Sequence, residues 1–366
     1  MKLAWKELTR RPGRFMVAGG ALTLITILQL LLGGLLDGLF LSATAAVRAQ
    51  SADLIVFSED SRNSLLRSRF EPEVRAQIES VDGVQSVSGF GVTLLGAKIP
   101  DEDEVADVAV FGYEAPNARV PAPLPTGQVW ADRSLEAVGV EIGDEVLVGP
   151  AGTPLTVKGW VEDTAYLFQG GLWGNEETWH TVLEQNRPDQ VLAPGTFQVG
   201  LVTAEGSADP EALAALIEGE VEGVTALTKD GAIAALPGVE AQNATFSQII
   251  NTTYLVAGLV VALFFALVTL ERVGLFGVLK AIGAGSGRLA SGLALQALLI
   301  AGGAFVLGGA LTFAMAAVIP PEVPVKLLPS RAASIAVAMV LTALVGSAIS
   351  FRRVVRIDPA SAVGGA

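Results

Sequence analysis

Four long apolar segments divide the chain. They carry no charged side chain and cover residues 15–36, 241–270, 289–321 and 332–351. Each reaches the roughly 20 residues that a helix needs to cross a bilayer. The pattern predicts four transmembrane helices, with one long polar segment between the first and the second.

The long polar segment, residues 43–245, has the pattern of a mixed α/β domain. Alternating or continuous apolar positions predict strands, and longer amphipathic stretches predict helices. The predicted strands are residues 53–57, 84–95, 197–203 and 223–227, and the predicted helices are residues 71–80 and 210–220. The two strand–helix–strand units would form a split βαβ layer around a strand-rich insert, residues 105–184.

Charge separates this domain from the apolar segments. Residues 43–245 hold 32 acidic and 11 basic residues, a net charge of −21, whereas the whole chain carries −13. Basic residues instead flank the apolar segments on one side, which the positive-inside rule makes cytoplasmic. An acidic outer domain argues against nucleic acid as a partner. The chain has no cysteine, which excludes disulfides and thiol catalysis.

The first apolar segment is predicted to stay in the protein as a helix, because no small-residue cleavage site follows it. The expected order is one helix, an extracytoplasmic domain and three helices, with both termini in the cytoplasm. The predicted parts are an amphipathic segment 1–14, helix 15–42, outer domain 43–245, helix 246–270, cytoplasmic loop 271–288, helix 289–319, outer loop 320–331, helix 332–351 and tail 352–366.

The loop between the second and third predicted helices has an amphipathic pattern of its own. Leu275, Val278, Leu279 and Ile282 follow the i, i+3, i+4, i+7 spacing of one helical face, and Gly283 favours the end of that helix. Such a short helix either lies in the bilayer interface or inserts its apolar face into a groove on a soluble partner.

The core of this loop reads Gly-Val-Leu-Lys-Ala-Ile-Gly-Ala over residues 277–284. It resembles the coupling loop of the MacB/FtsX-type ABC transporter permeases, the type VII ABC systems. The basic N-terminal arm and the Asp-Pro-Ala of residues 358–360 resemble the family too, and the compact outer domain is similar to its DevC/HrtB-like branch. Val273 and Gly274 stand where the family often has further charges.

The resemblance implies a permease subunit that works with ATPase subunits, two per complex, and with a second permease, which we expect to be an identical copy. The ATPase-coupling residues would be Glu271, Arg272, Leu275, Phe276, Val278, Leu279, Lys280 and Ile282. ATP hydrolysis would move the helices and the outer domain by mechanotransmission and extrude an amphipathic drug, peptide, lipid, lipoprotein or haem. The alternative is an FtsX-like transducer that activates an envelope hydrolase through an extracytoplasmic protein partner and transports nothing.

Chemistry beyond transport finds little support in the residues. No glycine-rich loop ends in the Gly-Lys-Ser/Thr that cradles ATP phosphates, so ATP–Mg would be bound by the partner ATPase and this chain would need no cofactor and have no catalytic residues. The chain has one histidine, His180, and no cysteine, whereas a zinc site needs three or four ligands, so no metal is expected.

Polar and polarisable side chains in or near the predicted helices are candidates for the substrate region, since an unpaired polar group in a membrane is costly. Hydrogen bonding between helices is the alternative explanation for them. Tyr254, Met315, Met339 and His180 are also considered as haem ligands. The candidates for the substrate region, close to membrane lipid, are Gln29, Asp37, Asn251, Tyr254 and Met339.

Overall fold

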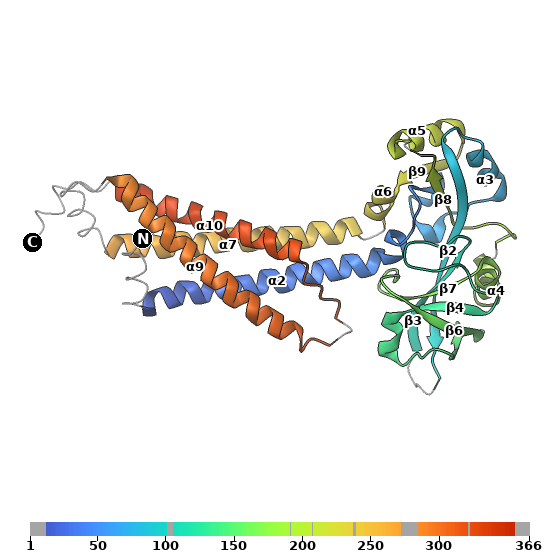
Figure 1. Cartoon of the computed structure of the whole chain (residues 1–366), viewed down its shortest axis with the longest axis horizontal. Coiled ribbons are helices and arrows are strands. Elements are labelled where there is room, and N and C mark those ends of the chain that lie inside the picture. The colour runs from blue at the N-terminus through green and yellow to red at the C-terminus, as the bar shows by residue number, and fades with distance from the viewer. Residues whose placement is uncertain are drawn as a thin grey trace, which may run out of the picture. The chain divides into compact units, whose positions relative to one another are not determined.

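The computed structural model describes residues 12–100, 105–190, 192–206, 208–236, 239–271, 285–320 and 323–355. It divides into a helical unit, Met1–Gly38 with Asn243–Ala366, and an outer unit, Leu39–Gln242. The helical unit is built from α2 (Pro12–Arg48), α7 (Val239–Glu271), α9 (Ser286–Ala316) and α10 (Pro329–Val355), which Figure 1 labels.

All four helices of the helical unit are long and apolar enough to cross a membrane, with mean hydropathies of 1.6 to 2.1 over the best segment of each. The prediction of four candidate membrane helices, with a mixed α/β domain inserted in the chain between the first and the second, is therefore confirmed. Large apolar side chains such as Leu24, Leu259, Val306 and Leu341 are exposed on the helices, as expected of side chains that face lipid.

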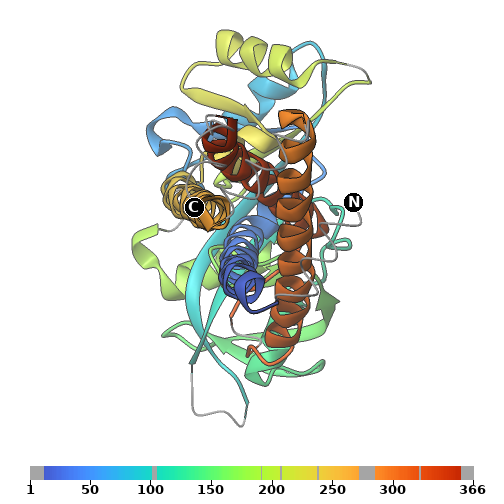
Figure 2. The same ribbon diagram turned by 90° about the vertical axis from the view of Figure 1, so that its left-hand side faces the viewer.

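Small residues pack the helices against one another. Ala297, Ala301 and Ala304 of α9 are buried in one cluster with Leu22 and Met339, and a Cβ atom at Gly308 would lie only 2.8 Å from the side chain of Thr26. Close backbone approach of this kind is the usual way in which membrane helices associate. In Figure 2, α2 and α7 are seen nearly end-on.

The outer unit contains one nine-stranded sheet in the order β3-β7-β4-β6-β5-β2-β8-β1-β9. Its strands are β1 (Leu54–Ser58), β2 (Val84–Lys98), β3 (Val105–Tyr113), β4 (Gln128–Asp132), β5 (Glu145–Val148), β6 (Thr153–Val161), β7 (Gly170–Gly174), β8 (Val199–Ala204) and β9 (Val224–Thr228).

The two expected strand–helix–strand units interleave in this sheet, so that strands of one alternate with strands of the other. The first is β1, α3 (Pro72–Glu79) and β2, and the second is β8, α5 (Pro210–Glu220) and β9. Their strands pair antiparallel in the order β2-β8-β1-β9. Apolar residues of α3 and α5, among them Ile78 and Ile217, are buried in one cluster with Leu54 and Val202 of the strands.

The long strand β2 connects this layer to the rest of the sheet. Its first half pairs with β8, and from Phe90 onward it pairs with β3. Behind β3, α4 (Glu176–Asn186) buries Trp179, whose indole Nε1 donates to Thr93 Oγ1 at 3.0 Å. Gly91 and Gly112 make room for this ring, because a Cβ atom at either would collide with it.

Candidate functional site: the polar seam between α2 and α10

A line of polar contacts runs between α2 and α10, and we call it the polar seam. The hydroxyl of Thr26 lies 3.3 Å from the sulfur of Met339. Two turns further along α2, Gly33 packs against the side chains of Ile335 and Arg331. Residue numbers rise on α2 as they fall on α10, so the two helices are antiparallel.

The outermost contact of the polar seam is an ion pair. Arg331 donates from Nε to Asp37 Oδ2 at 3.0 Å and from Nη2 to Oδ1 at 2.5 Å. The Asp37 side chain is 11% exposed and that of Arg331 is 35% exposed. Two parallel hydrogen bonds fix both side chains, as a guanidinium and a carboxylate match in shape.

Arg331 was not among the candidates predicted from the sequence. The apolar pattern places it in the predicted outer loop, residues 320–331, whereas α10 begins at Pro329 and so holds Arg331 in its first turn. Proline fits the first turn of a helix because the missing N–H would have no intrahelical partner there. The sequence did hold a signal for this earlier helix start, because Pro329 stands two residues before a lone arginine at the edge of an apolar segment.

Three glycines of α2 allow the close approach at this end of the seam. A Cβ atom at Gly33 would lie 3.2 Å from the Arg331 side chain, and one at Gly38 would overlap the carbonyl group of Pro324. The carbonyl oxygen of Gly34 accepts a hydrogen bond from the Lys326 N–H at 2.9 Å. The chain before α10 therefore lies directly on the backbone of α2.

Gln29 occupies the middle of the seam face of α2. Residues 26, 29, 33 and 37 are three or four positions apart and so share one face of the helix. Gln29 is 2% exposed, and among the described residues its Nε2 has no hydrogen-bond partner. A buried amide without a partner costs about 1–3 kcal/mol, which marks Gln29 as a group that a bound molecule could satisfy.

The remaining substrate-region candidates divide between the seam and the surface. Met339 is buried within the seam at 4% exposure. Tyr254 of α7 is partly buried and close enough to Arg331 for the two groups to interact electrostatically. Asn251 is exposed, one turn before Tyr254, and is not part of the seam. The structure thus brings together Gln29, Asp37 and Met339, with Tyr254 beside Arg331.

The predicted coupling loop lies largely outside the described residues. Helix α7 ends at Glu271 and α9 begins at Ser286. The other predicted coupling residues, Arg272, Leu275, Phe276, Val278, Leu279, Lys280 and Ile282, are outside the described part.

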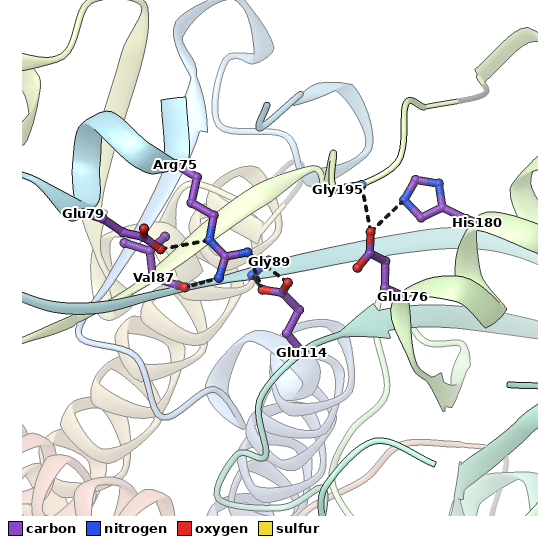
Figure 3. A network of polar contacts seen from close by, with 8 residues as sticks. All are labelled: Arg75, Glu79, Val87, Gly89, Glu114, Glu176, His180 and Gly195. Atoms are coloured by element: carbon purple, nitrogen blue, oxygen red, sulfur yellow. Dashed lines mark hydrogen bonds and ion pairs between the residues drawn. The ribbon is translucent and has the colours of Figure 1, made fainter. Parts of the chain in front are cut away.

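His180 lies in α4 of the outer unit. Its ring packs against Trp179 and Phe197, and its Nε2 is 3.8 Å from Glu176 Oε1, which accepts from the Gly195 N–H (Figure 3). Within the described ranges, no group of three or more His, Cys, Asp or Glu side chains could hold a metal ion. The partly buried histidine thus packs against aromatic side chains at the margin of the core.

Comparison with known proteins gives a family match for part of the chain and relatives for all of it. Residues 249–359 match the FtsX-like permease C-terminal domain. Over 100% of this chain and 99% of the relative, the chain is 22% identical to a putative hemin transport system permease protein HrtB of Staphylococcus epidermidis. It is 26% identical, over 99% of both chains, to an uncharacterized ABC transporter permease of Mycobacterium tuberculosis.

A second permease of Mycobacterium tuberculosis is 43% identical over 31% of this chain. Among solved structures, the extracellular domain of the noncanonic ABC-type transporter YknZ covers 48% of this chain at 14% identity, with a TM-score of 0.33. The periplasmic region of MacB from Actinobacillus actinomycetemcomitans covers 50% at 12% identity, with a TM-score of 0.34.

Proposed function

We propose that this chain is the membrane subunit of an ABC exporter, because residues 249–359 match the FtsX-like permease C-terminal domain and the whole chain is similar to ABC transporter permeases. ATP would be hydrolysed by separate ATPase subunits. The observation that carries the proposal is this similarity together with a partly buried ion pair between the first and last candidate spans.

The proposed assembly has two copies of this permease and two ATPases in the cell membrane of a bacterium, with both chain ends in the cytoplasm. The face of Leu275, Val278, Leu279 and Ile282 would dock on the ATPase, because its helical spacing gives one continuous apolar stripe. Docking of such a stripe into a groove would transmit movement of the ATPase to α7 and α9, which flank it.

Helix α2 is suited to carry movement outward. It is one unbroken helix of 37 residues, about 55 Å long at 1.5 Å per residue. Its last turns belong to the outer unit, where Ala45, Ala46 and Val47 are at most 2% exposed. There the Ala46 N–H donates to Ala165 O, and the Leu167 N–H donates to Ala43 O. A stiff helix fixed in this way supports mechanotransmission.

The polar seam suggests the chemistry of the transported molecule. It offers a partly exposed guanidinium at Arg331, a phenol at Tyr254 and an unpartnered amide at Gln29 beside apolar helix faces. These groups favour an amphipathic substrate that carries an acidic group. Haem, the cargo named for the HrtB relative, is one such molecule. Met339 is buried against Thr26, so Tyr254 is more accessible than Met339 as a candidate iron ligand at the seam.

Co-purification tests the proposed ATPase contact. The permease would be co-expressed with candidate ATPases and pulled down as the wild type, as Leu279→Asp and as the matched Ala284→Asp. We expect Leu279→Asp to lose the ATPase, because a carboxylate buried in an apolar groove is costly. Ala284→Asp, off the predicted face, should retain it. Equal recovery of ATPase with both variants would contradict the proposed docking face.

A further inference from the structure

The outer unit has an unpaired strand edge in the first half of β2. Residues Val84 to Phe90 pair with β8 on one side. On the other side β3 pairs only from Phe90 onward, and no strand of the described residues pairs there with the stretch before it. An edge of this kind presents backbone N–H and C=O groups to which another strand can add.

Side chains occupy this edge in the structure (Figure 3). Arg75 of α3 donates from Nη2 to the Val87 carbonyl oxygen at 2.7 Å, and Glu114, just after β3, accepts from the Gly89 N–H. Arg75 Nη1 lies 2.9 and 3.0 Å from the two Glu114 oxygens, and Arg75 Nε lies 3.0 Å from Glu79. We call these three side chains the clasp.

The clasp is open to exchange with solvent. The side chains of Arg75 and Glu114 are 30% and 27% exposed, and a partly exposed ion pair contributes little to stability. Burial lowers the pKa of Arg75, but the hydrogen bonds and charges of Glu114 and Glu79 outweigh burial and raise it. The guanidinium therefore stays charged, and the clasp carries a net charge of −1.

A cavity of about 360 Å³ lies beside the same edge. It is lined by Arg75 and Glu114 of the clasp and by the polar residues Ser51, Ser86, Ser88, Asn117 and Thr203, among others. Asn117 Oδ1 accepts from the N–H groups of residues 119 and 120. Its Nδ2 is shut off from solvent and has no partner within the described part of the chain.

The lining points to a peptide main chain. It contains no aromatic side chain, so it lacks the flat apolar surface on which a ring could stack. The strand edge beside it presents N–H and C=O groups that match the alternating acceptors and donors of an extended backbone. The clasp and the outer unit, at −21 over residues 43–245, disfavour an acidic segment.

We propose that the β2 edge binds an extended, neutral or basic peptide segment of a partner protein, which adds as a strand beside residues 84–88. Arg75 and Glu114 release Val87 O and Gly89 N as the peptide takes their place. The clasp thus protects the edge from nonspecific pairing until a partner arrives. This site lies entirely within the outer unit and does not depend on transport.

The test uses the full-length permease in lipid nanodiscs and a phage-displayed library of random twelve-residue peptides. Recovered peptides would be synthesised and their affinities measured for the wild type, Arg75→Ala, Val87→Pro and Val87→Ala. We expect Arg75→Ala to bind several-fold more tightly, because the competing side chain is gone. Val87→Pro, which lacks the N–H of the edge, should bind at least tenfold more weakly, whereas Val87→Ala keeps that N–H and should bind within about threefold of the wild type.

A control in the peptide avoids any dependence on how the variants fold. In an added strand, alternate residues direct their N–H groups to the same edge. Methylation of alternate peptide nitrogens in one register should abolish binding to the wild type, and methylation in the other register should be tolerated. The proposal is overturned if no recovered peptide slows amide exchange in residues 84–89, or if both registers of methylation are tolerated.

Discussion

The ion pair of the polar seam can be tested by replacing Arg331 with methionine. Removing one partner of a fully buried pair costs about 3–5 kcal/mol, because the other charge stays buried and unpaired. The Asp37 side chain is 11% exposed but that of Arg331 is 35% exposed, so part of the penalty is screened by solvent. We expect Arg331→Met to lower the free energy of unfolding by about 2 kcal/mol.

A double-mutant cycle separates the pair from the packing of its side chains. Asp37→Leu alone leaves the arginine unpaired, whereas Asp37→Leu with Arg331→Met removes both charges and should come within about 1 kcal/mol of the wild type. The assay is unfolding of the permease in bicelles titrated with a denaturing detergent. Additive losses in the two single variants, with no coupling in the double variant, would refute the role of the pair.

Three further predictions concern single side chains. Gly38→Val should open the loop that precedes α10 and speed its cleavage by trypsin, since a Cβ atom at Gly38 overlaps the loop backbone. The control Gly20→Val, whose Cβ meets nothing within 4 Å, should not change the cleavage rate. Equal cleavage rates in the two variants would be evidence against this packing. Gln29→Leu should raise the free energy of unfolding by about 1 kcal/mol, because it removes a buried amide whose Nε2 has no partner among the described residues. The same variant should lower the transport rate. An unchanged transport rate would remove Gln29 from the substrate region. Asp132→Ala should speed amide exchange in residues 163–168, as its Oδ2 accepts from the N–H and the hydroxyl of residue 164 at 2.8 and 2.6 Å; no change relative to the exposed Asp107→Ala would contradict that anchoring.

The sequence predicts the elements of this protein well, because each depends on local spacing. Apolar runs of about twenty residues specify the four helices whatever their neighbours, and the helix expected at residues 210–220 is observed as Pro210–Glu220. Strand β1 begins one residue later than expected, at Leu54. The charge imbalance, −21 over residues 43–245 against −13 for the whole chain, also distinguishes the outer domain from the helices by composition alone.

Pairing between distant segments could not be predicted in the same way. Asp37 stood out as a polar group near the membrane, but its partner is 294 positions away, and several arginines could have served. Strand β2 is 15 residues long. It joins two parts of the sheet that the sequence pattern predicts separately, as a βαβ layer and as a strand-rich insert. Neither the clasp nor the unpartnered amide of Gln29 has a local signal, because both depend on tertiary packing.

In the proposed function, a partner ATPase drives extrusion of an amphipathic substrate that contacts the polar seam of this protein. The most direct measurement is ATP hydrolysis by the permease and its ATPase in lipid nanodiscs, with hemin, a macrolide, a lipopeptide or no addition. We expect saturable stimulation by one of these compounds, lost in Arg331→Met and retained in Gly20→Val. Steady hydrolysis that is indifferent to every compound, with wild type and variants alike, would contradict it.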